Sequence, residues 1–222
     1  MIDKMTLKTG DEFMASDLPI RWLLPCAVLL CAAAAAQSNS FVSLMPEKEV
    51  AEKWVIVGTP PEVWSVKGGV IACAGNPMGY LRTRQKYKNY VFHAEWRFQK
   101  EGWTGAPEEW PNAGFFIHAS EETGKTWPLS FVEVQGHYGE AGSLFGGRIQ
   151  GAKRGPIVKD RIPFGEWDKY EVTSNKGTVR VVLNGKLVNE GYGADPPEGY
   201  ICLQSEGWPV FYRNIKIKVL PE

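Results

Sequence analysis

Apolar and polar residues alternate along most of the chain, in short runs separated by glycine, proline and asparagine. The clearest run is FVEVQGH at residues 131–137, where two valines point to one side and Glu133, Gln135 and His137 point to the other. A carboxylate, an amide and an imidazole in one row can bind polar ligands and move protons. The run therefore predicts a strand whose polar face is either a solvated surface or the floor of a binding site.

The same alternation recurs in short segments, and none of them shows a long helical period. The Asn184-Gly185 pair is typical of a type I′ hairpin turn. Many short strands without helices between them predict an all-β fold, a sandwich or jelly roll, with one short helix near Glu47–Lys53. The expected strands are two within Val63–Cys73, then Tyr90–Phe98, Ala113–Ala119, Phe131–Gln135, Leu144–Gln150, Trp167–Ser174, Thr178–Leu183, Lys186–Asn189, Gly199–Gln204 and Val210–Val219.

Alternation also predicts which side chains share the face opposite the core. This open face could line a groove, and its long loops would form the rim. The expected open-face residues are His93, Glu95 and Arg97 in the segment Tyr90–Phe98, Phe116 and His118 in the segment Ala113–Ala119, and Cys202, Gln204 and Glu206 near the C-terminus.

The N-terminal region predicts export. Residues 22–36 (WLLPCAVLLCAAAAA) form an apolar run that follows Arg21 and ends in small residues, as in a secretory signal peptide cleaved after Ala36. Met14 would give a signal of ordinary length, so residues 1–13 could be a mis-assigned start. The run is short for a membrane span, so no transmembrane span is expected in the mature protein. Residues 37–53 would then be a lead-in, and residues 54–222 one domain in a secreted or periplasmic protein.

Composition narrows the partners. The formal net charge is zero and no long basic run occurs, which argues against nucleic acid as a partner. Nine tryptophans favour a carbohydrate ligand, because aromatic faces stack on sugar rings, although most tryptophans pack in cores. Trp103 and Trp110, in a loop rich in glycine and proline, are the best stacking candidates. Cys73 and Cys202 remain after the leader and could either pair or stay apart as buried thiols.

The order and spacing of several segments resemble one known family, the 3-keto-disaccharide hydrolase domain family, over residues 54–220. The segments are GVIACAGNPMGYLRTRQKYKNYVFHAEWRF, NAGFFIHAS, FVEVQGH, FGEWDKYEVTSNKGTVRVVLNGKLV and GYICLQSEGWPVFYRNIKIKVL. The resemblance implies a concanavalin A-like jelly-roll β-sandwich of two antiparallel sheets, in secreted bacterial proteins that act on glycosides. It places the family's E-V-Q motif at Glu133 and Gln135, and its N-x-G-x-F motif at Asn112. His118 stands where many members have an arginine or another polar group.

The residues limit the mechanism. Ordinary glycosidases use two carboxylates, but Gln135 stands where a second acid would follow Glu133 on the same strand. A 3-keto sugar offers another route, in which a base removes the acidified C2 proton, the glycosidic oxygen leaves C1, and water then adds. Glu133 or His118 is the expected base. Substrate binding is expected from Gln135, His137, Glu95, Arg97, Gln204, Glu206, Trp103 and Trp110. A divalent metal could polarise the ketone, although no H-x-H or HExxH spacing supports one.

Simpler interpretations remain open. Glu133 and Gln135 could form a cross-strand polar ladder on a wet sheet, and His137 could sit in a loop. Glu95 and Arg97 could form a surface ion pair of little energetic value. The function could correspondingly be that of a non-catalytic, lectin-like carbohydrate-binding module, or of a structural envelope domain, because one sandwich fold serves many functions.

Overall fold

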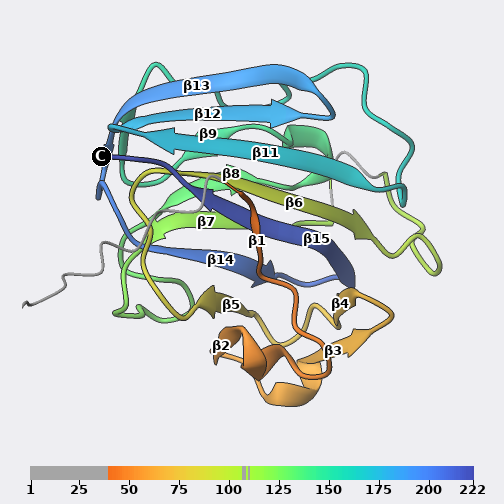
Figure 1. The fold of residues 1–222 in the computed structure, drawn as a ribbon. Helices are drawn as coiled ribbons and strands as arrows, with labels where there is room; N and C mark the ends of the chain where they lie inside the picture. The colour runs from red at the N-terminus through yellow and green to blue at the C-terminus, as the bar shows by residue number, and fades with distance from the viewer. Residues whose placement is uncertain (1–39, 107–108, 110) are drawn as a thin grey trace, which may run out of the picture. The chain divides into compact units, whose positions relative to one another are not determined.

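Two antiparallel β-sheets form the described part of the chain (Figure 1). The computed structural model describes residues 40–222 except 107, 108 and 110, so the expected signal peptide and Trp110 lie outside the described residues. Among the described residues, no helix is long and apolar enough to cross a membrane. The predicted all-β jelly-roll sandwich is confirmed.

The nine-stranded sheet faces the viewer in Figure 1. Its order is β10 (Arg148–Gln150), β13 (Lys186–Asp195), β12 (Thr178–Leu183), β11 (Asp168–Asn175), β6 (Tyr90–Phe98), β15 (Val210–Val219), β4 (Val70–Cys73) and β3 (Trp64–Lys67), and β1 (Val42–Ser43) also pairs with β15. The six-stranded sheet lies behind it, in the order β2 (Trp54–Val57), β5 (Gly79–Thr83), β14 (Tyr200–Ser205), β7 (Gly114–Ala119), β8 (Val132–Gln135) and β9 (Leu144–Phe145).

Short 3₁₀ turns join some of the strands: η1 (Val50–Glu52), η2 (Pro61–Val63) and η3 (Tyr138–Glu140). The helix expected at Glu47–Lys53 is thus only the single turn η1. The Asn184-Gly185 turn adopts positive φ at both residues, as the type I′ geometry requires. β13 extends well beyond the expected Lys186–Asn189, and β1, β2 and β5 were not among the expected strands.

The core lies between the sheets and is centred on Phe115 of β7. Its ring makes edge-on contacts with Phe92, Trp96, Tyr170 and Tyr212 of the nine-stranded sheet, at centroid distances of 5.8, 5.5, 5.7 and 5.8 Å. Such aromatic pairs add to the stabilisation from apolar burial. The alternation of β6 and β8 is fixed by this core, because their apolar residues point into it.

Cys73 and Cys202 are both free and buried, and they lie in different sheets. Cys73 belongs to the central core, whereas Cys202 lies on the outer side of the six-stranded sheet. Their side chains therefore do not face each other, and the disulfide alternative is not formed.

Candidate functional site

A polar row crosses the outer face of the six-stranded sheet. Val132 and Val134 pack in the core, so Glu133 of β8 points outward, and Gln204 of β14 points outward between two core residues in the same way. Gln204 Nε2 donates a hydrogen bond of 3.2 Å to Glu133 Oε1, across the intervening strand β7. The structure therefore brings together two of the predicted site residues from segments 71 positions apart.

Gly114 makes this contact possible. It lies on β7 between the two side chains, and a Cβ there would be 2.7 Å from Gln204 Oε1 and 3.2 Å from Glu133 Oε1. Both distances are shorter than ordinary van der Waals contacts. The glycine of the N-x-G-x-F motif thus provides the space in which the amide meets the carboxyl group.

The carboxyl groups of this site are protonated more readily than usual. Burial raises the pKa of Glu133 to about 8, an effect that the nearby Glu206 carboxyl increases and the Gln204 hydrogen bond opposes. Burial also raises the pKa of Glu206 to about 7, and hydrogen bonding by the Asn112 side chain partly offsets that rise. Two carboxyl groups with pKa values near neutrality in one place are typical of acid–base sites.

Several polar atoms around the pair are buried without a hydrogen-bond partner in the described chain: Gln204 Oε1, Glu206 Oε2, Asn112 Oδ1 and His137 Nδ1. Buried polar groups are normally satisfied, and an unsatisfied one costs roughly 1–3 kcal/mol. The three oxygens accept hydrogen bonds, which is what the hydroxyl groups of a sugar can donate.

Gln135 and His137 lie at the end of β8. Gln135 is buried, and its Oε1 accepts a hydrogen bond of 2.8 Å from the backbone nitrogen of His137. That bond fixes the turn into η3, so part of the Gln135 side chain has a structural role. His137 is half-buried just beyond the strand, in the loop position considered as its simpler interpretation.

An aromatic cluster occupies the other half of the same outer face. It comprises Tyr80, Phe116, Ala119, Tyr200 and Cys202, with Val57, Trp127 and Phe131 packed against it. Phe116 is the cross-strand partner of Glu133. Trp127 packs edge-on against the Phe116 ring, with ring centroids 5.4 Å apart. Phe145 pairs with Glu133 from the other side and is half-buried. Aromatic rings thus flank the carboxyl group on both neighbouring strands.

His118 lies on the core side of β7, so its expected place on the open face is wrong. The register between β7 and β14 shifts at this point: Ile117 and His118 of β7 lie opposite Ile201 alone, and His118 has a φ of +53°. This β-bulge interrupts the alternation and turns two successive side chains inward.

The His118 ring is held on both sides within the core. Its Nδ1 lies 2.8 Å from Pro196 O and its Nε2 lies 2.9 Å from Ser174 Oγ. Because a carbonyl oxygen only accepts, Nδ1 carries the proton of the neutral ring. Burial lowers the pKa of His118 to about 4, so the ring is neutral at pH 7. These contacts give it the geometry of a structural core histidine.

Glu95 and Arg97 do not join the site either. They lie on β6, in the nine-stranded sheet, and their core neighbours Ala94 and Trp96 force them outward on the opposite side of the sandwich from Glu133. Glu95 is bound by Arg213 Nε at 2.7 Å and by Asn214 Nδ2 at 2.9 Å. The grouping of both residues with Glu133 was wrong because alternation assigns a face within each sheet and does not relate the two sheets.

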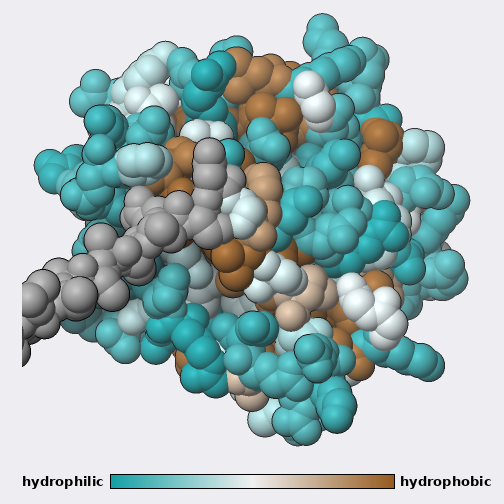
Figure 2. Space-filling view, viewed as in Figure 1, coloured by the Kyte–Doolittle hydropathy of each residue, from teal (hydrophilic) through white to brown (hydrophobic). Residues whose placement is uncertain are grey.

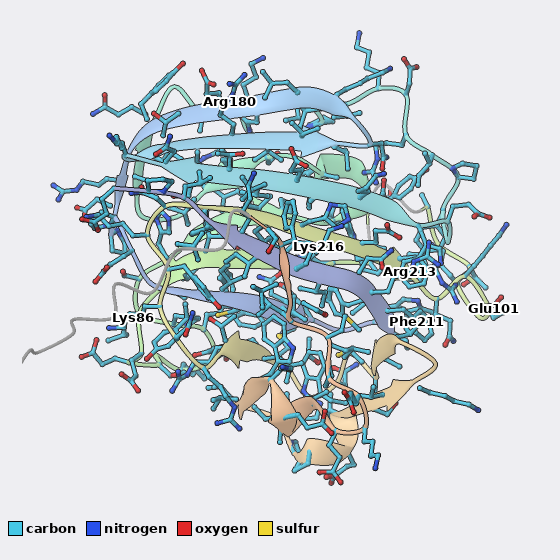
Figure 3. All side chains as sticks on the ribbon, viewed as in Figure 1. Lys86, Glu101, Arg180, Phe211, Arg213 and Lys216 are labelled. Atoms are coloured by element: carbon cyan, nitrogen blue, oxygen red, sulfur yellow. The ribbon has the colours of Figure 1, made fainter. Side chains whose placement is uncertain are left out.

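Arg97 lies over two aromatic rings on this face. Its guanidinium is 4.5 Å from the ring centroid of Phe211 and 5.3 Å from that of Trp167. Phe211 and Arg213 are labelled near the beginning of β15 in Figure 3. Figure 2 shows hydrophilic residues over much of this side of the molecule, with hydrophobic patches between them.

Trp103 packs into a separate aromatic cluster. Its ring lies 5.1 Å from Trp208 and 6.1 Å from Phe164, and Phe164 in turn stacks on Phe98 at 6.1 Å. Its half-buried indole therefore closes one end of the sandwich. The stacking of Trp103 on a sugar, expected from the sequence, is untested, and the Trp103→Ala variant is designed to test it.

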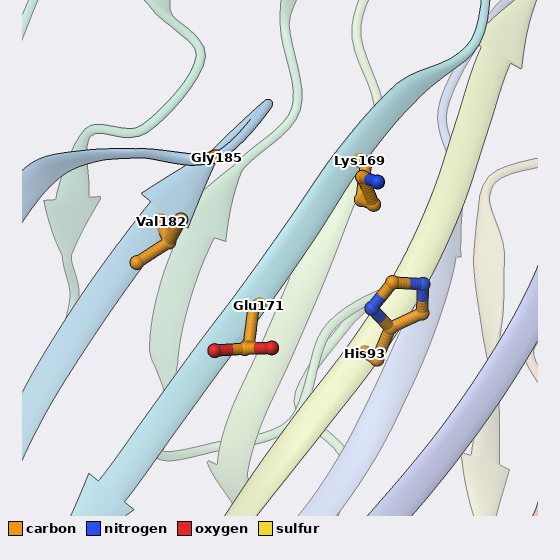
Figure 4. A pocket seen from close by; sticks show the side chains of 5 residues that line it. All are labelled: His93, Lys169, Glu171, Val182 and Gly185. Carbon is orange, nitrogen blue, oxygen red and sulfur yellow. The ribbon is translucent and has the colours of Figure 1, made fainter.

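A hollow of about 430 Å³ lies on the outer face of the nine-stranded sheet. It is lined by His93, Lys169, Glu171, Val182 and Gly185 (Figure 4). Burial and the nearby Lys216 lower the pKa of His93, while Glu95 opposes the shift. The hollow lies on the side of the sandwich opposite Glu133, so it is not part of the polar row.

No group of three or more histidine, cysteine, aspartate or glutamate side chains in the described chain is placed to hold a metal ion. We therefore assign no metal ligands. The divalent metal considered from the sequence is tested below by reactions with EDTA and with added Mn²⁺.

The two packed antiparallel sheets define the fold class, a concanavalin A-like jelly roll. The chain belongs to the family of the 3-keto-alpha-glucoside-1,2-lyase-like domain, whose model matches residues 40–218. The resemblance predicted from the sequence is thereby confirmed. A 3-keto-disaccharide hydrolase of Bacteroides thetaiotaomicron is 24% identical over 215 residues, covering 72% of this chain and 71% of that protein.

Solved structures share the fold. A Parabacteroides distasonis protein provisionally assigned as a glycosyl hydrolase matches with a TM-score of 0.61 and 22% identity, covering 82% of this chain and 95% of that one. The carbohydrate-binding module CBM66 of Bacillus subtilis matches with a TM-score of 0.55 and 11% identity, covering 75% and 95%. Similar sandwiches therefore occur both in a protein assigned as a glycosyl hydrolase and in a carbohydrate-binding module.

Sequence reasoning missed Trp127 and Tyr80 as members of this face. Trp127 lies between Gly124 and Pro128 in the segment after β7. Its sequence context resembles that of Trp103 and Trp110, the two stacking candidates predicted from the sequence. Tyr80 belongs to β5, an unexpected strand, so its orientation had no pattern to reveal it. Trp127 could have been found from its loop context, but Tyr80 could not.

Proposed function

We propose that this protein is an enzyme that cleaves 3-keto-glucosides, with Glu133 as the base. The observation that carries the proposal is the buried Glu133 carboxyl group, whose pKa is raised to about 8 and which is held by Gln204 on the outer sheet face. Family membership supports the substrate class, and the Bacteroides relative is named for 3-keto-disaccharides.

The reaction follows from the chemistry of the ketone. A carbonyl group at C3 acidifies the C2–H bond, and Glu133 takes that proton as the C2 electrons form an enolate. The enolate then re-forms the C3 ketone and a C1=C2 double bond, while the C1–O bond breaks and the leaving alcohol takes up a proton. Water next adds its hydroxyl to C1 and C2 regains a proton, so the net reaction is hydrolysis.

Glu133 suits this role because its raised pKa makes its carboxylate a stronger base than an ordinary one. Gln204 orients the group through the 3.2 Å hydrogen bond, and the space at Gly114 keeps the two side chains together. The buried acceptors Gln204 Oε1 and Asn112 Oδ1 would accept hydrogen bonds from sugar hydroxyls. We further propose that Phe145 and Trp127 form the apolar edges of the sugar site.

A second candidate function is sugar binding without turnover. The similarity of the fold to the CBM66 module favours it, because that protein is a carbohydrate-binding module. The two candidates differ in what happens to a 3-keto sugar after it binds.

The test is incubation of the purified protein with 3-keto-trehalose and with 3-keto-lactose. Released glucose or an unsaturated keto sugar, followed by NMR, supports the enzyme. Parallel reactions with EDTA or added Mn²⁺ reveal any metal requirement. Binding of the same sugars by calorimetry without any product would instead support the binding module. Glu133→Gln should abolish turnover, and Glu171→Gln, on the other sheet, should not.

We also propose that the protein acts outside the cytoplasm, as the apolar run at residues 22–36 predicts. Expression of the full chain in a bacterial host, followed by mass spectrometry of the exported protein, tests this. A mature N-terminus at Gln37 supports it, and an uncleaved cytoplasmic chain contradicts it.

A further inference from the structure

We propose that Glu206 is the general acid that protonates the departing glycosidic oxygen, opposite Glu133 in the same site. The inference rests on the proposed function above and extends it to a second catalytic residue. It supplies the group that the strand of Glu133 lacks, because Gln135 occupies the position of a second acid on β8.

Glu206 directly follows β14, which ends at Ser205. Ile201 and Leu203 are core residues, so Cys202 and Gln204 point to the outer side of β14, and Glu206 is the first residue after the strand. Gln204 hydrogen bonds with Glu133, and the carboxyl group of Glu206 is near enough to help raise the pKa of Glu133.

The backbone around Glu206 is fixed from two directions. Gly207, the next residue, forms an isolated parallel bridge with Asn112, just before β7. Gly207 N also donates to Gly75 O at 2.6 Å, and Asn76 Nδ2 donates to Gly207 O at 3.0 Å. A carboxyl group carried on such an anchored segment is held in position before the substrate arrives, which is what general acid catalysis needs.

One oxygen of the Glu206 carboxyl group has no partner among the described residues. Asn112 hydrogen bonds with the Glu206 side chain, whereas Glu206 Oε2 is buried and has no hydrogen-bond partner among the described residues. Gln204 Oε1 is likewise unpartnered, on a residue that is only 1% exposed. A protonated Glu206 has a hydroxyl to donate at this place, and the leaving oxygen is an acceptor.

The protons balance over the cycle. In the elimination, Glu133 gains the C2 proton and Glu206 gives its proton to the leaving oxygen. In the hydration, Glu206 takes a proton from the attacking water while the hydroxyl bonds to C1, and Glu133 returns its proton to C2. The pKa of Glu206, raised to about 7, suits a group that gives and takes a proton near neutral pH.

The experiment compares two leaving groups. 3-Keto-trehalose releases a sugar alcohol that needs protonation, whereas 4-nitrophenyl 3-keto-α-glucoside releases a stable phenolate that does not. Glu206→Gln should lower kcat/KM for 3-keto-trehalose on the order of 10²–10⁴-fold and for the nitrophenyl glycoside by less than about tenfold. Glu133→Gln should lower both equally. Glu171→Gln serves as the matched control and should change neither.

A second measurement isolates the first proton transfer. In D₂O, wild-type protein and Glu206→Gln should both exchange the C2 proton of methyl 3-keto-α-glucoside, and Glu133→Gln should not. Retained exchange also shows that Glu206→Gln is folded. If the wild type is active and Glu206→Gln loses kcat/KM equally on both substrates, the role of Glu206 as general acid is overturned, while the proposed function stands. A wild-type protein that neither cleaves nor exchanges either sugar would overturn the proposed function as well.

Discussion

The side-chain amide of Gln204 donates a 3.2 Å hydrogen bond to the carboxyl group of Glu133 across Gly114. The two residues come from β14 and β8, and the glycine lies on β7 between them. Because Gly114 gives β7 no side chain at this point, residues of the two flanking strands, β14 and β8, can form a hydrogen bond over it. The site is therefore built by three strands, one of which contributes only space.

Gly114→Ala should disable the site with a limited loss of stability. The new Cβ would lie 2.7 Å from Gln204 Oε1, so the amide must move away from Glu133. A displacement near 1 Å in a catalytic site can cost on the order of 10²-fold in rate. We expect such a loss in kcat/KM on 3-keto-trehalose, and a fall of roughly 1–3 kcal/mol in the free energy of unfolding.

The matched control for this change is Gly124→Ala. There the nearest atoms to a new Cβ would be Leu129 Cδ2 at 3.3 Å and Trp127 O at 3.4 Å, so little must move. Kinetics and urea unfolding should remain close to those of the wild type. Unchanged kinetics in Gly114→Ala would contradict the role given to this glycine.

Glu133→Gln should stabilise the protein at alkaline pH while it abolishes turnover. The pKa of Glu133 is raised to about 8 in the folded state from an ordinary 4.5, so the folded protein holds a proton that the unfolded chain releases. The stability that this group contributes is complete below about pH 4.5 and is lost as pH rises to about 8. Glutamine removes this loss, because it does not ionise.

Urea unfolding at pH 5, 7 and 9 measures the effect. The difference between variant and wild type should grow with pH and reach a few kcal/mol at pH 9, at about 1.4 kcal/mol per pKa unit. Glu171→Gln, which changes an exposed carboxyl group on the other sheet, should leave the pH dependence as it is. A variant that loses stability at every pH would show that Glu133 has a structural role.

Alternation predicted the strands with strong apolar periods and the faces of β6, β8 and β14, because a core-facing residue at every second position leaves little freedom. It also placed Glu133 and Gln204 outward. It failed at His118, because a β-bulge adds one residue and the sequence carries no sign of it.

The partnership of strands was harder to predict than their faces. Glu95 and Glu133 are both outward residues, yet they belong to different sheets, and that depends on long-range pairing that no local pattern encodes. The same limit hid Tyr80 and the meeting of Glu206 with Asn112, whose segments are brought together by the bridge between Asn112 and Gly207. The family resemblance supplied the fold, but not these contacts.

His118→Asn should cost stability and spare catalysis. Asparagine tolerates the positive φ of +53° at this position, so the backbone can keep its bulge. The variant loses the contact of the imidazole ring with Ser174, in the core and away from Glu133. We expect a fall of roughly 1–3 kcal/mol in the free energy of unfolding and a kcat/KM within about threefold of the wild type.

The pH dependence gives this prediction a second readout. The pKa of His118 is lowered to about 4 from 6.5, so the unfolded chain takes up a proton first as the pH falls. The stability that this group contributes is complete above about pH 6.5 and is lost as the pH falls to about 4. His118→Asn should reduce that acid-side loss, and a large drop in kcat at pH 7 would instead restore His118 as a catalytic candidate.

Trp127→Ala and Trp103→Ala should separate sugar contact from packing. Trp127 packs edge-on against Phe116, the cross-strand neighbour of Glu133, so its loss should raise KM for 3-keto-disaccharides several-fold while kcat changes little. Trp103 packs 5.1 Å from Trp208 in another cluster, so its loss should lower the unfolding free energy by about 3 kcal/mol or more and leave KM unchanged. Steady-state kinetics and thermal unfolding of both variants test the pair. A raised KM in Trp103→Ala, with a wild-type KM in Trp127→Ala, would place the sugar site near Trp103. Sugar contact would then belong to Trp103 and not to Trp127.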